Sequence, residues 1–163
     1  MKHGTLCYIR RDGKTLMVHR NKREDDFHFG KYVAIGGKNE EGEDDETCAR
    51  REVFEEAGLT INKLTKRATI IFRNGRRKFN GRITEKDYSV VVYFAEEFEG
   101  EPKKECEEGT LEWIADSELL KLPMHEGDKL FTPWLYGKDN GYFEAELFHE
   151  GDKLANHSVI FRQ

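Results

Sequence analysis

The sequence predicts a mixed α/β fold of the α+β kind, built around a mixed β-sheet. Strand-like segments recur along the whole chain, and helical patterning is confined to a few segments. Most strand-like segments are joined by turns that are too short for helical crossovers, so the sheet should contain antiparallel as well as parallel pairs. A length of 163 residues suits one domain, and residues 1–163 are expected to form it.

The first third of the chain has strand character. Residues 4–20 predict a hairpin, because the strand-like runs TLCYIR and TLMVHR flank the turn signal Asp12-Gly13. Residues 21–31 are polar and predict a loop. The run KYVAIGG then returns to strand character and ends in paired glycines, so a third strand is expected there.

Residues 44–57 predict a helix. Apolar residues recur at a spacing of four and would face the core: Ala49, Val53 and Ala57. Acidic residues at its start favour the positive end of the helix dipole: Asp44, Asp45 and Glu46. Gly58 suits the C-terminal stop of this helix.

The remainder alternates strands with two short helices. Residues 64–72, 87–99, 110–115 and 141–148 predict strands, and HSVIFR predicts a last one. Residues 116–121 and 125–136 have helical character. The segment from 73 to 85 is basic and rich in turn residues, and is therefore expected to be a hairpin tip.

Composition excludes several classes of protein. A net charge of −5 argues against a general nucleic-acid binder. The N-terminal residues are too polar for a signal peptide, and no apolar run approaches the roughly 18 residues of a membrane span. Three cysteines without a CxxC pair argue against a disulfide framework or a zinc cluster. These features predict a cytoplasmic protein with reduced thiols and no membrane partner.

Four charged residues of the predicted helix indicate a binding site for a divalent cation. Glu52, Glu55 and Glu56 stand at i, i+3 and i+4 and share one helix face, directly after Arg51. Their mutual repulsion would be relieved by a hard divalent cation, and oxygen-rich sites suit Mg²⁺ or Mn²⁺. A bare REVFEE run is usually a solvated face. Here the context favours a functional site instead, because paired glycines precede the helix and Gly58 closes it.

The segment GKNEEGEDDETCARREVFEEAGL resembles the Nudix box, Gx5Ex7REUxEExGU, where U is aliphatic. It matches every fixed position: Gly37, Glu43, Arg51, Glu52, Val53, Glu55, Glu56, Gly58 and Leu59. The resemblance implies the Nudix fold, in which a mixed central β-sheet is sandwiched between helices. It also implies an enzyme that splits a diphosphate linkage with water.

The same resemblance implies site roles. Glu52, Glu55 and Glu56 would act as metal ligands or as the catalytic base, which stays unassigned among them, and the carbonyl of Gly36 would help to hold Mg²⁺ or Mn²⁺. Arg51 would orient a carboxylate as part of the catalytic group, while Glu43 would pair with that arginine. Family members often add an acidic residue from a loop before a late strand, and Glu108 matches it best.

Flanking segments resemble the MutT-type branch, which hydrolyses oxidised purine nucleoside triphosphates such as 8-oxo-dGTP. The matching runs are CYIRRDGKTLMVHRNKR, GKYVAIGGK, LPMHEGDKLFTPWL and GYFEAELFHEGDKL. The resemblance implies that Asp128 reads the purine edge. Tyr32 and Phe27 are candidates for stacking on the base, and Arg23 and Lys38 complete the candidate substrate-binding residues.

Departures from that branch concern the base. Val33 stands where some relatives carry an asparagine that bonds the base. His125 and Gly127 stand where some carry a tryptophan and a second aspartate. The discrimination of 8-oxoguanine is therefore open, and a canonical or differently modified nucleotide is an alternative.

A small nucleotide is the expected partner of a monomer or homodimer, and the sequence also offers alternatives. The basic segment 73–82 would suit an RNA 5′ end, or simply form a solvated hairpin tip. ADP-ribose hydrolases usually place a proline after the box, where this chain has none. A non-catalytic, nucleotide-binding Nudix domain would commonly lose box glutamates, and this chain retains all of them.

Overall fold

The computed structural model describes residues 1–74, 78–79, 82–83, 86–137, 141–151 and 153–162. Within them a nine-stranded sheet has the order β11-β10-β5-β8-β1-β2-β3, with β4 paired to β1 and β9 to β2. Its strands are β1 (Lys2–Arg11), β2 (Lys14–His19), β3 (Tyr32–Val33), β4 (Ile35–Lys38), β5 (Thr60–Arg73), β8 (Tyr88–Glu99), β9 (Thr110–Ala115), β10 (Tyr142–Glu150) and β11 (Lys153–Arg162).

The sheet is mixed, as predicted. β1 runs parallel to β8, and β10 runs parallel to β5, whereas β5 and β8 are antiparallel. Two further strands, β6 (Lys78–Phe79) and β7 (Arg82–Ile83), form a separate pair. The basic segment predicted at 73–85 lies partly outside the described residues, so its proposed RNA contact has no structural account.

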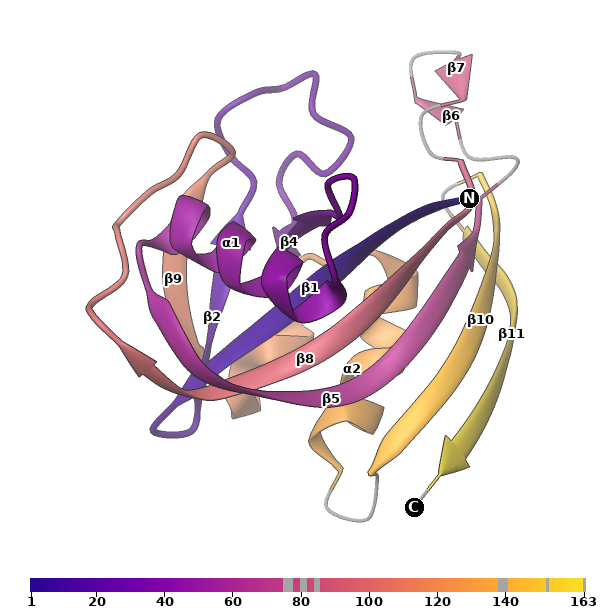
Figure 1. Cartoon of the computed structure of the whole chain (residues 1–163). Helices are drawn as coiled ribbons and strands as arrows, with labels where there is room; N and C mark the ends of the chain where they lie inside the picture. Colours follow the sequence, from indigo (N-terminus) through magenta and orange to yellow (C-terminus); the bar gives the residue numbers. More distant parts are fainter. Residues whose placement is uncertain (75–77, 80–81, 84–85, 138–140, 152, 163) are drawn as a thin grey trace.

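Helices cover both faces of the sheet (Figure 1). The helix α1 (Asp45–Ala57) packs on one face, while η1 (Asp116–Lys121) and α2 (Glu126–Tyr136) lie on the other. The central strand β8 shows why both layers form. Val91 and Tyr93 belong to the core beneath α1, whereas Val92 and Phe94 belong to the core that contains α2 residues. Alternation across a strand that is buried on both sides produces the continuous apolar run of its sequence.

The predicted helix over residues 44–57 is confirmed. Asp44 is its N-cap, and its carboxylate accepts a hydrogen bond from the backbone N–H of Thr47 at 2.8 Å. Gly58 ends the helix in the left-handed region at φ 75°, which glycine adopts without a steric penalty. The buried face consists of Cys48, Ala49, Val53 and Ala57. No described helix has the length and apolar character that crossing a membrane would demand.

Two of the predicted strands are longer in the structure than the sequence pattern indicated. The strand expected at 64–72 spans Thr60–Arg73, because its pairing with β8 continues across several register shifts. The last strand begins at Lys153, since β10 holds it in antiparallel register from that residue onward. Segment 116–121 is a 3₁₀ helix, and the helix predicted from residue 125 begins at Glu126.

Candidate active site

Paired glycines bring the sheet against the glutamate helix. β4 pairs with β1, and a Cβ atom at Gly36 would collide with the carbonyl oxygen of Thr5. A Cβ atom at Gly37 would collide with the carboxylate of Glu52, which therefore lies directly on the strand backbone. The absence of side chains at both positions allows α1 to deliver this carboxylate to the end of β4.

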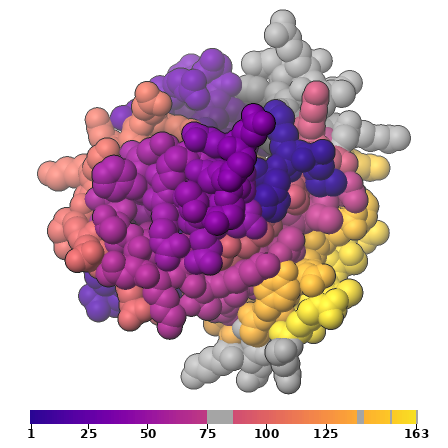
Figure 2. All heavy atoms as spheres, in the orientation of Figure 1, coloured from indigo at the N-terminus to yellow at the C-terminus, as the bar shows by residue number. Residues whose placement is uncertain are grey.

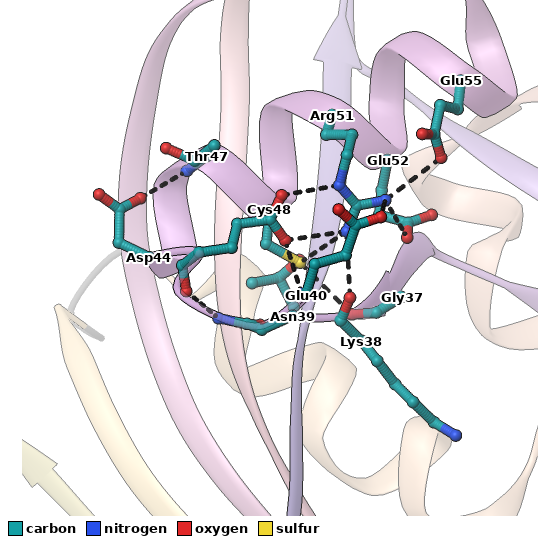
Figure 3. Close-up of polar contacts among 12 residues, drawn as sticks. Gly37, Lys38, Asn39, Glu40, Asp44, Thr47, Cys48, Arg51, Glu52 and Glu55 are labelled. Atoms are coloured by element: carbon teal, nitrogen blue, oxygen red, sulfur yellow. Dashed lines mark hydrogen bonds and ion pairs between the residues drawn. The ribbon is translucent and has the colours of Figure 1, made fainter.

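Arg51 holds the loop and the helix together. Its Nε and Nη2 donate to the two oxygens of Glu43 at 2.7 and 2.9 Å. The same guanidinium also donates to Glu52 at 3.0 Å, to Glu55 at 3.3 Å and to the carbonyl of Lys38 at 3.1 Å. These contacts are drawn as dashed lines in Figure 3. Hydrogen bonds from Arg51, and then from the backbone of Glu40, lower the pKa of Glu43 to about 2. Such a bidentate pair holds the guanidinium of Arg51 in one orientation.

Three carboxylates crowd together where α1 meets the loop before β9. Oε2 of Glu56 is buried and has no hydrogen-bond partner among the described residues. Burial, followed by the nearby carboxylates of Glu108 and Glu52, raises the pKa of Glu56 well above its ordinary range. Glu108 also accepts a hydrogen bond from Nη1 of Arg20 at 2.8 Å. A buried, unpartnered carboxylate oxygen beside two further carboxylates fits a divalent cation.

The carboxylates are gathered but do not converge on one point. Among the described residues, no three His, Cys, Asp or Glu side chains already form a set of metal ligands. The ion pairs explain this, because Arg51 holds Glu52 and Glu55 while Arg20 holds Glu108. Glu55 is the exposed member, with 55% of its side chain accessible, against 16% for Glu52.

A cavity of about 400 Å³ adjoins the paired glycines. Both Gly36 and Gly37 line it, together with two predicted substrate-binding residues, Lys38 and Asp128. The space-filling view shows the neighbouring loop–helix segment at the surface, beside the N-terminal residues drawn in indigo (Figure 2). The cavity therefore extends from the paired glycines, against which the carboxylate of Glu52 packs, to the start of α2.

Aromatic rings form one wall of this cavity. The ring of Phe27 stacks on that of His125, with centroids 5.2 Å apart and an interplanar angle of 14°. Nδ1 of His28 lies 2.7 Å from Nε2 of His125, which is a hydrogen bond between imidazoles. All three residues line the cavity. A planar base can stack on such a wall.

The structure places the other two predicted substrate-binding residues elsewhere. Tyr32 does not line the cavity; its ring stacks on His19 at 4.2 Å and its hydroxyl donates to Glu112 at 3.3 Å. Arg23 is exposed in the loop before β3 and does not line it either. Val33, the neighbour of Tyr32, does line it. The structure thus brings together Lys38 and Asp128, but not Arg23 and Tyr32.

A larger cavity of about 770 Å³ lies beside the C-terminal end of α2, and its described lining contains neither of the paired glycines that adjoin the glutamate helix. Its arginines already have structural partners. Arg10 pairs with Asp116 at 2.6 Å, and Arg67 donates to the carbonyl of Leu135 at 2.6 Å. A cation at this end of a helix also balances the helix dipole. The smaller cavity is therefore the candidate site.

The fold and the comparisons define a class of protein: a hydrolase that acts on diphosphate bonds, of a kind that generally uses a divalent cation. Residues 2–135 match the NUDIX domain family. The oxidized purine nucleoside triphosphate hydrolase of Danio rerio is 31% identical over 157 residues, covering 95% of this chain and 92% of that protein. The uncharacterized Nudix hydrolase YvcI of Bacillus subtilis is 31% identical over 126 residues, covering 76% and 72%.

The crystal structure of a MutT protein from Bacillus halodurans has the same fold. It superposes with a TM-score of 0.80 at 27% identity, and covers 98% of this chain and 97% of that one. The chain belongs to the Nudix hydrolase family and is MutT-like. The sequence indicated the glutamate helix, but not three further imidazoles that line the cavity, those of His3, His28 and His149.

Proposed function

We propose that the protein hydrolyses purine nucleoside triphosphates, including oxidised forms such as 8-oxo-dGTP, to the monophosphate and pyrophosphate with Mg²⁺ or Mn²⁺. One observation carries the proposal. The cavity that contains Asp128 and the Phe27–His125 stack opens onto the paired glycines that adjoin the glutamate helix. A base in that cavity would leave its phosphates beside the carboxylates. The name of the Danio rerio relative supports the same substrate class.

The carboxylates would have two roles, as ligands of the cation and as acceptor of a proton. Glu52, Glu56 and Glu108 fit as cation ligands because they crowd one buried spot, and the Gly36 carbonyl is the candidate backbone ligand. A bound divalent cation neutralises phosphate oxygens and lowers the pKa of water. Glu55 is the most exposed of the three glutamates of the REVFEE run and is held by Arg51, so it can serve as a ligand or accept a proton. The base stays unassigned among the three box glutamates.

Substrate contacts follow from the cavity. Both Lys38 and Asp128 line the cavity, which supports Lys38 as a phosphate contact and Asp128 as an acceptor of hydrogen bonds from the base. Arg23 remains a candidate phosphate contact from the exposed loop, and Tyr32 a candidate for stacking only after its ring leaves His19. Lys38→Ala should therefore raise KM more than Arg23→Ala does, and equal effects would contradict this assignment.

We also propose that residues 1–163 work as one domain in the cytoplasm, as a monomer or homodimer. β10 follows the matched residues 2–135 and continues the same sheet in parallel register with β5, which supports a single domain. Cys7 and Cys48 are free, buried thiols, which supports a reducing compartment. Sedimentation of the purified protein measures the number of subunits.

A substrate panel tests the proposed activity. Purified protein is assayed with Mg²⁺ on 8-oxo-dGTP, dGTP, dATP, ADP-ribose and 5′-triphosphate RNA, and kcat/KM is compared. The highest value is expected for a purine nucleoside triphosphate. A strong preference for ADP-ribose or RNA would contradict the proposed substrate class while leaving the family unchanged. Glu55→Gln on the same panel shows whether cleavage depends on the box.

A further inference from the structure

Arg20 lies directly after β2, at the point where the loop of residues 21–31 begins and returns. Its backbone N–H donates to the carbonyl of Lys31 at 2.9 Å, and its own carbonyl accepts from the N–H of Gly30 at 2.7 Å. The side chain of Arg20 is only 13% exposed and lines the candidate cavity. The backbone of Arg20 thus closes the loop, and its side chain lies beside the cavity.

The guanidinium of Arg20 also holds the interior of this loop, through Asp26. Its Nε and Nη2 donate to the two carboxylate oxygens of Asp26 at 2.7 and 3.0 Å. Oδ1 of Asp26 accepts a further hydrogen bond from the backbone N–H of His28 at 3.1 Å, and the Asp26 side chain is only 8% exposed. Burial acts to raise the pKa of Asp26, but the hydrogen bonds from Arg20 and His28 outweigh it and lower that pKa. The bidentate pair therefore fixes the segment that carries Phe27 and His28, which form the aromatic wall of the cavity.

The remaining nitrogen of the same guanidinium reaches the loop before β9. Nη1 of Arg20 donates to Oε2 of Glu108 at 2.8 Å. A Cβ atom at the following residue, Gly109, would collide with the carbonyl oxygen of His19, so the backbone of this loop packs directly on the end of β2. Burial, and next the charge of Glu108, raise the pKa of Glu56, which shows that the two carboxylates are close together. Arg20 thus orients a candidate cation ligand as well as the aromatic wall.

We infer that Arg20 is a positioning residue that couples the two halves of the site, because one guanidinium orients both Glu108 for the cation and the Phe27–His28 segment for the base. The inference rests on the proposed function, since it takes Glu108 as a cation ligand and the cavity as the place of the base. A guanidinium suits this double contact, because its donors form a rigid planar fork that can hold two carboxylates at once. Outer partners that orient a metal ligand commonly contribute about tenfold to a hundredfold in metal affinity.

Two separate binding measurements test the inference. Mn²⁺ binding is measured by electron paramagnetic resonance without nucleotide, and guanosine binding by calorimetry in EDTA. Guanosine carries no phosphate, so its affinity reports on the base site alone. Asp26→Asn should weaken guanosine binding by about tenfold and keep the Mn²⁺ affinity, although Asp26 itself does not line the cavity. Glu108→Gln should do the reverse, and Arg20→Gln should weaken both ligands by about tenfold or more.

Arg11→Gln is the matched control. Arg11 makes a bidentate pair of the same kind with Glu101, at 3.1 and 3.2 Å, but this pair lies at the surface and neither residue lines the cavity. The control should keep both affinities. Arg20→Lys provides a second variant in case Arg20→Gln does not fold. An ammonium keeps the charge and lacks the planar fork, so this variant should keep at most one of the two affinities.

Three results would overturn the inference: a folded Arg20→Gln that keeps either wild-type affinity, an Arg20→Lys that keeps both, or a wild type that binds no guanosine. Equal losses of Mn²⁺ and guanosine binding in Asp26→Asn would also contradict it, because the loop would then act on the cation site without Arg20. A wild type that binds Mn²⁺ and guanosine, shows the expected pattern in the variants and cleaves no nucleoside triphosphate would refute only the proposed function.

Discussion

Glu56→Gln should have opposite effects on stability and activity. Burial, with the carboxylates of Glu108 and Glu52 nearby, raises the pKa of Glu56 from 4.5 to about 9. At pH 7 the unfolded chain ionises this group, whereas the folded protein keeps it protonated. The contribution of this group to the free energy of unfolding is fully present below pH 4.5 and is lost as the pH rises toward 9. Over the interval from 4.5 to 7, at about 1.4 kcal/mol per unit, the loss reaches about 3 kcal/mol.

Urea unfolding in EDTA measures this effect. Glutamine mimics the protonated carboxyl, so the variant should exceed the wild type by about 3 kcal/mol at pH 7 and match it near pH 4.5. Adding Mg²⁺ should stabilise the wild type more than the variant. Hydrolysis by the variant should fall by about a hundredfold or more, since a candidate cation ligand is lost.

Glu46→Gln is the matched control, because Glu46 lies exposed on the same helix and pairs with Arg50. Its stability should stay within about 0.5 kcal/mol of the wild type, with full activity. The reasoning is refuted if Glu56→Gln is less stable than the wild type at pH 7 and the difference between them does not change with pH.

Further substitutions test the loop and the helix end. Gly37→Ala should lower kcat, because the new Cβ would displace the carboxylate of Glu52; unchanged steady-state kinetics would contradict the close packing. Asp44→Ala removes the N-cap of α1 and should cost about 1 kcal/mol in urea unfolding, whereas no loss would show that water replaces the cap. The pKa of Glu43 is lowered from 4.5 to about 2, chiefly by Arg51, so its contribution to stability exists above pH 4.5 and is lost as the pH falls through 2. The difference in unfolding free energy between the wild type and Glu43→Gln should therefore shrink below pH 4.5, and a constant difference would contradict the ion pair.

Local patterns were enough to predict the glutamate helix. Its apolar spacing and the stop at Gly58 lie within one short segment, and the structure confirms both. Asp44 was expected in the first turn and is the N-cap instead. The order of the strands was not predictable in the same way. The parallel pairing of β1 with β8 joins residues that lie far apart in the sequence, and no local pattern encodes which strands become neighbours.

Which residues line the cavity was likewise only partly predictable from local patterns. Tyr32 and Val33 are adjacent on β3, and successive side chains of a strand point to opposite faces, so an error of one position exchanges the cavity for the His19 stack. His149 could have been noticed as a polar residue that continues an apolar alternation. Its approach to Gly127 depends on tertiary packing, which the sequence does not display.

Product analysis by phosphorus NMR tests the central claim most directly. Wild-type protein is incubated with 8-oxo-dGTP or dGTP, with Mg²⁺ or with EDTA, and the released phosphates are identified. We predict the nucleoside monophosphate and pyrophosphate in Mg²⁺, and no cleavage in EDTA. Release of orthophosphate with the nucleoside diphosphate, or equal cleavage in EDTA, would contradict the proposed cation-dependent pyrophosphohydrolase.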